Sequence, residues 1–160
     1  MNIKNILGIG FFLSLSIFSL YSMHESLYDK RQRLMSAIWG NNLCAVRAIL
    51  NEGLNPNFYW GRNDTTPLVD AMFMNQYKIV EILLDHEANP NFAKRIGERP
   101  FFLAVFRNNI PAMKLLIQRG ADWRIHYDEI MHDEWMEETI TEPTKRWLKE
   151  YATPQPRGAE

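Results

Sequence analysis

Apolar and polar residues in the middle of the chain recur with the period of amphipathic helices. The segments "TPLVDAMF", 66–73, and "KIVEILLDH", 78–86, each place apolar side chains three and four residues apart. That spacing predicts two short helices that each bury one face. The residues on the predicted inner faces are Leu68, Ala71, Ile79, Val80, Leu83 and Leu84.

The ends of these helices carry their own signals. Thr66 can cap the free N–H groups of the first helix, and Pro67 suits its first position. Asn75-Gln76 separates the two helices. Asn89 precedes a proline and is therefore pushed into extended geometry, so the second helix leads into an extended loop.

The pattern repeats every 33 or 34 residues. "GLNPNF", 53–58, returns as "EANPNF", 87–92, and superposing the two copies aligns four columns over three units. The columns are Ala37/Ala71/Ala104, Val46/Val80/Met113, Leu50/Leu84/Ile117 and Gly53/Glu87/Gly120. A fixed period of this length is typical of repeat architectures, in which each helix pair buries its apolar face on its neighbours.

The second unit, "TTPLVDAMFMNQYKIVEILLDHEANPNF", resembles an ankyrin repeat. The resemblance extends over 34–124 and implies an all-α ankyrin-repeat solenoid of about three helix-turn-helix repeats with hairpin loops, plus N- and C-terminal capping helices. The expected repeats are 30–60, 61–93 and 94–124, within a domain of 27–151. We expect 125–151 to be a degenerate last repeat or a C-terminal cap, and 152–160 to be a frayed tail.

Two residues depart from the ankyrin pattern. Arg99 stands where the second repeat has its capping Thr, which forfeits a cap worth ~1 kcal/mol. Glu87 stands where the other repeats have glycine, and a left-handed backbone there costs roughly 1–2 kcal/mol.

The N-terminal segment differs from the rest of the chain. One positive charge, Lys4, precedes an apolar run from Ile6 to Leu20, which is short for a membrane span and suited to a signal-peptide core. We expect 1–22 to be a signal peptide that exports the protein to the periplasm. The alternative is an uncleaved anchor in the inner membrane, and Lys30, Arg31 and Arg33 just beyond the run complicate both readings.

The composition excludes several kinds of chemistry. Eighteen basic and 19 acidic residues give a net charge of −1, so no basic field predicts nucleic-acid binding. His126 and His132 lack the spacing of a zinc peptidase, and the single cysteine, Cys44, is expected to be a small buried hydrophobe. We find no catalytic, metal or cofactor motif and predict that the protein is not an enzyme.

The ankyrin resemblance implies a concave binding face formed by the ends of the first helices and by the hairpin tips. An aromatic residue recurs at the end of each first helix. The next residue is Gly40 in the first repeat, Met74 in the second and Arg107 in the third. These rings either pack on the adjacent helix pair or line the concave face; we expect the latter. The predicted protein-binding residues are Trp39, Tyr59, Trp60, Arg62, Phe73, Met74, Arg95, Ile96, Phe106 and Arg107.

The resemblance therefore implies a protein-binding module and no cofactor. The chain is similar to small ankyrin proteins of bacterial periplasms, some of which are immunity proteins that block toxins. We expect an exported module that neutralises a toxin or effector. The alternative is an inner-membrane-anchored assembly or protective partner of an envelope enzyme.

Overall fold

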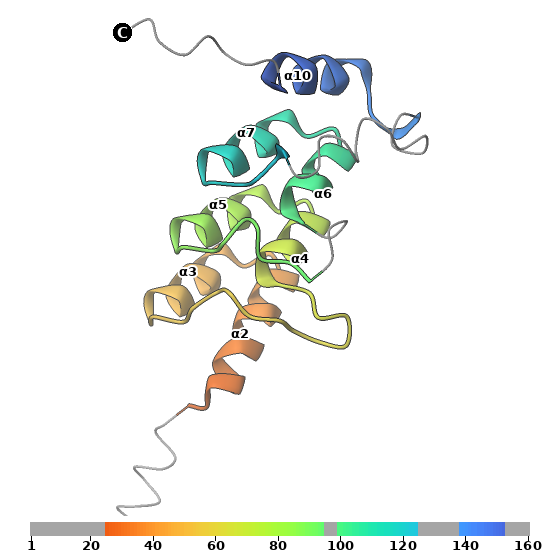
Figure 1. Cartoon of the computed structure of the whole chain (residues 1–160). Helices are drawn as coiled ribbons and strands as arrows, with labels where there is room; N and C mark the ends of the chain where they lie inside the picture. The colour runs from red at the N-terminus through yellow and green to blue at the C-terminus, as the bar shows by residue number, and fades with distance from the viewer. Residues whose placement is uncertain (1–24, 95–98, 125–137, 153–160) are drawn as a thin grey trace, which may run out of the picture.

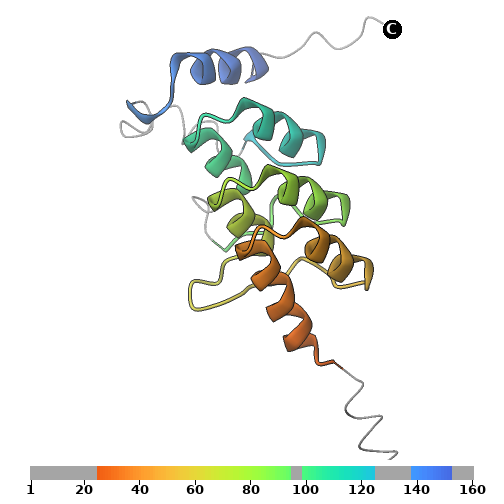
Figure 2. The same ribbon diagram turned by 180° about the vertical axis from the view of Figure 1, so that it is seen from behind.

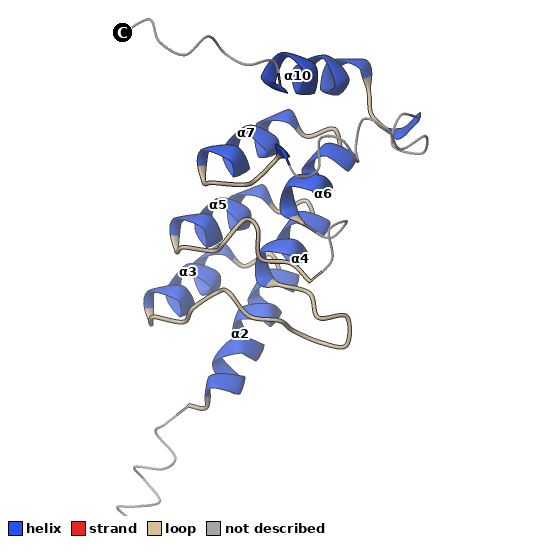
Figure 3. Cartoon of the chain, in the orientation of Figure 1, coloured by secondary structure: helices blue, strands red, loops and turns tan. Residues whose placement is uncertain are grey.

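The computed structural model describes residues 25–94, 99–124 and 138–152 of the 160-residue chain. Within these ranges the chain forms helices and no strand, apart from an isolated bridge between Trp60 and Thr65 (Figure 3). The helices are α2 (Leu27–Trp39), α3 (Leu43–Asn51), α4 (Pro67–Phe73), α5 (Tyr77–Asp85), α6 (Pro100–Phe106), α7 (Ile110–Gln118) and α10 (Glu142–Ala152).

Six of the helices form three pairs that stack on one another. Helix α2 packs on α3, α4 on α5 and α6 on α7, and between pairs α2 contacts α4, α4 contacts α6 and α3 contacts α5. Figures 1 and 2 show the first helices in one column and the second helices in the other. This confirms the all-α repeat solenoid predicted from the 33/34-residue period.

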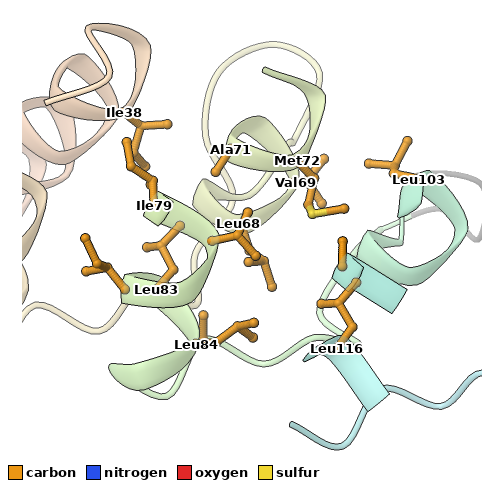
Figure 4. Packing of buried hydrophobic residues seen from close by; sticks show 14 of the residues in the cluster. Ile38, Leu68, Val69, Ala71, Met72, Ile79, Leu83, Leu84, Leu103 and Leu116 are labelled. Atoms are coloured by element: carbon orange, nitrogen blue, oxygen red, sulfur yellow. The ribbon is translucent and has the colours of Figure 1, made fainter. Parts of the chain in front are cut away.

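One hydrophobic core runs through the stack. Ala71 and Met72 of α4 and Leu83 of α5 are fully buried, and Figure 4 shows them facing side chains of the neighbouring pairs. The alanine column is buried in all three repeats, which lets the first helices approach closely. Ile140 and Leu148 from the C-terminal segment belong to the same core.

Each first helix ends in a left-handed asparagine. Asn41, Asn75 and Asn108 have φ values of 50°, 62° and 54°. Their N–H groups and those of the following residues donate back to carbonyls of the helix, as in the bond of 2.9 Å from Gln76 N to Ala71 O. Asparagine tolerates this conformation better than most residues do, so the column closes each helix at low cost.

Each second helix ends in a left-handed residue as well. Gly53 and Gly120 have φ values of 84° and 86°, and Glu87 between them has 63°. Glu87 therefore does adopt the left-handed backbone, the condition on which the expected strain depends. Because Glu carries a Cβ, this one helix end is strained where its two counterparts are not.

The duplicated Asn-Pro-Asn segment links neighbouring repeats through hydrogen bonds. Its first asparagine accepts from the second within a local turn: Asn57 N donates to Asn55 Oδ1 at 2.8 Å. Its second asparagine reaches the next repeat: Asn57 Nδ2 donates to Glu87 O at 3.0 Å, and Asn57 Oδ1 accepts from Asn89 N at 2.7 Å. The next copy repeats these contacts through Asn91. The repetition therefore serves cohesion between repeats.

The caps of the first helices follow the sequence. Val69 N donates to the Thr66 hydroxyl at 3.2 Å, which confirms the cap predicted for α4. Helix α6 begins after Arg99, whose side chain makes no capping hydrogen bond. The two helices therefore start from the same Pro-containing turn, and one of them lacks the side-chain acceptor.

The C-terminal segment docks on the third repeat through Asn108. Asn108 Oδ1 accepts from Thr141 N at 2.7 Å, and Asn108 Nδ2 donates to Thr139 O at 3.2 Å. Helix α10 then buries Thr144 and Leu148. The helix lies at the capping position, at the end of the stack opposite the start of α2 (Figure 1). The rest of the predicted cap, 125–137, lies outside the described residues, as do the export segment and most of the expected tail.

One prediction about packing is wrong. Cys44 is exposed on α3 and is not buried. The buried face of α3 contains Val46, Ile49 and Leu50. Cys44 precedes Val46 by two positions, and two residues correspond to more than half a helical turn, so its thiol lies on the opposite side.

Candidate binding surface

The recurring aromatic residues are the last residues of α2, α4 and α6. Trp39 and Phe73 are each 49% exposed, whereas Phe106 is half-buried and packs against the core. Met74, which follows Phe73, is 46% exposed. The open part of the aromatic column therefore belongs to the first two repeats.

Polar contacts hold the Trp39 ring and the Phe73 backbone in place. Trp39 Nε1 donates to Asp70 Oδ2 at 2.9 Å, and the Thr65 hydroxyl donates to Asp70 Oδ1 at 2.8 Å. Asp70 thus ties the end of α2 and the hairpin to α4. Arg107 Nη2 donates to the Phe73 carbonyl at 2.6 Å and links the second repeat to the third.

A hairpin forms the wall opposite α4. Trp60 N donates to Thr65 O at 2.8 Å and Thr65 N to Trp60 O at 3.2 Å, with positive φ at Gly61 and Asp64. Lys94 of the following loop pairs with Asp64. Between the hairpin and α4 lies a hollow of about 570 Å³, here called the groove. It is lined by Arg62, Asn63, Asp64, Thr65, Val69, Asp70, Phe73, Met74 and Lys94.

The other flank of the hairpin faces a different surface. Tyr59 stacks on Phe92 with ring centres 4.7 Å apart. The Trp60 ring lies 5.3 Å from Tyr28 of α2 and 6.3 Å from Phe58. None of these five rings lines the groove.

The structure divides the predicted binding residues into groups. Arg62, Phe73 and Met74 meet in the groove, Trp39 joins them through Asp70, and Arg107 joins through the Phe73 carbonyl. Phe106 is half-buried, and Tyr59 and Trp60 lie on the other flank. Arg95 and Ile96 are outside the described residues.

Sequence reasoning missed most of the polar walls of the groove. Asp70, Thr65 and Asp64 were not among the residues expected on the binding face. The sequence offered only a weak signal for Asp70, which is an acidic residue in the first turn of α4. Its contact with Trp39 of the preceding repeat is visible only in the structure. Asp70 matters because it accepts from two different elements.

Charge is unevenly compensated around these surfaces. Arg33 pairs with Glu25 and Glu52, and chiefly the hydrogen bond that it donates to Glu25 raises the pKa of its guanidinium above the usual value. Arg62 has no carboxylate partner in the part of the chain that the structure describes.

Among the described residues no cluster of three potential metal ligands occurs. His126 and His132 lie beyond them.

Comparison with known proteins identifies the fold family. A family model described as "Ankyrin repeats (3 copies)" matches residues 16–94 and 34–127, which together cover more than half of the chain. The chain belongs to the ankyrin-repeat family. Ankyrin repeats are a non-catalytic interaction fold, so the family confirms a protein–protein interaction module.

The similar proteins are diverse. Over 89 residues, 56% of this chain, it is 36% identical to the human 2-5A-dependent ribonuclease, of which the alignment covers 12%. It is 28% identical over 97 residues, 61% of the chain, to a putative ankyrin repeat protein of Rickettsia felis, of which 32% is covered. A Borreliella burgdorferi putative ankyrin repeat protein is 27% identical over 93 residues, 58% of the chain and 41% of that protein. The chain thus spans less than half of each relative.

No helix among the described residues has both the length and the apolar character needed to cross a membrane.

Proposed function

We propose that this ankyrin-repeat protein binds a partner protein in the groove between the hairpin and α4. The observation that carries the proposal is the exposed pair Phe73 and Met74, which open into a hollow whose walls are held by Asp70 and by the Asp64–Lys94 pair. An apolar floor between fixed polar walls is the arrangement in which a partner's side chain can be desolvated.

Preformed walls favour binding because little order has to be gained. The Trp39 ring and the hairpin are already held through hydrogen bonds to Asp70. Association therefore freezes few additional side chains, and each immobilised side chain would otherwise cost about 0.5–1.5 kcal/mol. Arg62, which lacks a carboxylate partner within the described residues, adds a donor at the rim.

We propose further that the module acts in the bacterial envelope. The apolar run Ile6–Leu20 supports export to the periplasm, and the role we favour there is that of an immunity or inhibitor protein that covers a toxin or effector. The second candidate is an inner-membrane-anchored assembly or protective partner of an envelope enzyme. It is supported by the sequence before a cleavage after Ser22. Leu20 stands three residues before that cut, at a position that usually holds a small residue.

Photo-crosslinking tests the groove. A photoreactive residue at position 74 should capture one envelope protein, and the same residue at Lys78, on the exposed part of α5, should not. Phe73→Ala with Met74→Ala should weaken the interaction with the captured protein by ~2 kcal/mol or more while the melting temperature stays close to wild type. Equal capture from both positions, or unchanged affinity in the double variant, would refute the groove.

Two further measurements separate the envelope roles. The mass of the protein purified from its native cells reports whether residues 1–22 are retained. Expression of the captured protein in the periplasm reports whether it is toxic and whether this chain relieves that toxicity. A toxic partner supports the immunity role, and a harmless enzyme whose yield falls without this chain supports the second candidate.

A further inference from the structure

Exposed apolar side chains gather where α2 begins and the hairpin crosses it. Leu27 is 57% and Tyr28 63% exposed, although both belong to the first turn of a helix. With Gly61 and the hairpin residues beside them, they line a hollow of about 620 Å³. We call this surface the aromatic end: Leu27, Tyr28, Arg31, Tyr59 and Trp60. It shares no residue with the groove, so groove binding does not account for it.

The rings of the aromatic end are held in place by the fold. Trp60 is fixed by its backbone pairing with Thr65, and its ring meets Tyr28 and Phe58. The guanidinium of Arg31 lies over the Phe58 ring, 4.8 Å from its centre. The surface therefore combines aromatic bodies, polar tips and one cation in a rigid arrangement.

The cations of α2 divide into two groups. Lys30 and Arg33 face carboxylates, with distances of 3.9 Å from Lys30 to Glu52 and 2.6 Å from Arg33 to Glu25. Arg31 lines the aromatic end and, in the described ranges, has no carboxylate partner. Arg62 also has no carboxylate partner in the described ranges, but it lines the groove and not this surface. The aromatic end thus carries net positive charge.

The chain brings this surface close to its apolar N-terminal run. Seven Cα–Cα steps separate Leu20 from Leu27, the first residue of α2, and they span at most about 25 Å. If the run remains in a bilayer, Leu27 at the aromatic end cannot lie farther than that from the last residue of the run. Figures 1 and 2 show the start of α2 at one end of the stack and α10 at the other.

We propose that the aromatic end rests on the surface of an anionic lipid bilayer, so that the stack stands on its first repeat with α10 pointing away. Trp and Tyr rings favour the level of the lipid headgroups, and arginines without carboxylate partners attract anionic lipids. Leu27 adds an apolar contact. The proposal rests on the membrane-anchored form of the proposed function, and it leaves the groove open to a protein partner.

Tryptophan quenching by brominated lipids tests the contact. The full chain is reconstituted into nanodiscs of phosphatidylethanolamine and phosphatidylglycerol, with and without bromine on the acyl chains just below the headgroups. Part of the emission should be quenched in the wild type. Trp60→Phe should abolish that part, whereas Trp147→Phe, in α10 at the far end, should leave it unchanged.

Further variants keep the test decisive. Leu27→Ser with Tyr28→Ser changes two exposed residues and should reduce the quenching at least two-fold, as should Arg31→Glu or the replacement of phosphatidylglycerol by phosphatidylcholine. Equal quenching of wild type and Trp60→Phe would overturn the proposal, as would equal quenching on the two lipid mixtures. Phe73→Ala with Met74→Ala should not alter quenching, which separates this outcome from a failure of the groove.

Discussion

Two methionines two positions apart distinguish the groove from the hydrophobic core between the helix pairs, here called the spine. Met72, inside α4, is fully buried between helix pairs, whereas Met74, just after the helix, is nearly half exposed in the groove. The residue between them, Phe73, belongs to the open side. The same helix end therefore contributes to stability on one side and presents apolar surface to solvent on the other.

The difference between the two methionines shows how a repeat can expose apolar side chains for binding and still pack firmly on its neighbours. The spine uses small and aliphatic side chains at fixed columns, and the groove exposes the residues at the end of the first helix. Hydrogen bonds through Asp70 and the Asn-Pro-Asn segments hold the two sides in register. Substitutions on the two sides should consequently have different effects, and those effects can be ranked.

The largest expected effect comes from the spine. Met72→Ala should reduce the free energy of unfolding by about 2–5 kcal/mol, because it leaves a cavity between packed helix pairs. Met74→Ala is the matched control and should change it by less than ~0.5 kcal/mol. Chemical denaturation followed by circular dichroism measures both. Similar losses for the two variants would mean that the groove is part of the core.

The next largest effect concerns cohesion between repeats. Asn91 Nδ2 donates to Gly120 O at 2.9 Å, and Asn91 Oδ1 accepts from Asp122 N at 2.8 Å. Asn91→Ala should cost about 1–3 kcal/mol of unfolding free energy, because both backbone groups lose their partner. Hydrogen exchange should show faster exchange at Asp122 N–H.

Asn55→Ala is the control for that experiment. It removes only a local turn contact and should cost distinctly less than Asn91→Ala. Asn91→Asp keeps the acceptor, removes the donor and places a carboxylate against the Gly120 carbonyl. Its free energy of unfolding should also be lower than that of the wild type. A neutral Asn91→Asp would show that the bond to Gly120 contributes nothing.

A stabilising change is expected at the strained helix end. Glu87→Gly relieves the left-handed backbone and should raise the free energy of unfolding by ~1 kcal/mol, after allowance for the greater freedom of glycine in the unfolded chain. Glu87→Ala keeps the strain and removes the charge, so it should be close to neutral. Equal gains from both would identify the charge as the cause.

The sequence predicted the spine well because the spine is periodic. The Ala37/Ala71/Ala104 column followed from superposing the repeats, and the Thr66 cap from the Thr-Pro pair that opens α4. The same superposition marked Glu87 as the residue that stands in the glycine column. A further column, Asn41/Asn75/Asn108, was available in the same alignment and marks the first-helix exits. Cys44 was misplaced because its neighbours are apolar, although its helical angle places it outside.

The groove could be predicted only in part, because its members are not all periodic. The aromatic column located Trp39 and Phe73, but Phe106 at the same register is half-buried, since local packing and not register sets exposure. The hairpin residues 59–65 lie in the loop between α3 and α4, outside the helical columns. Their division between two surfaces depends on the turn at Gly61, which no column records.

The smallest effect on stability is expected at Trp39, where the ring and its hydrogen bond can be separated. Trp39→Phe keeps an aromatic ring and removes the indole N–H that donates to Asp70 Oδ2. Because this bond is solvent-exposed, and Asp70 still accepts from Thr65, the free energy of unfolding should fall by no more than ~0.5 kcal/mol. Binding to the protein captured by the groove should fall more than stability does, because a loosened Asp70 no longer fixes the hairpin wall. Calorimetry of unfolding and titration with that protein measure the two quantities on one sample. A loss of stability that matches the loss of affinity would assign Trp39 to the spine.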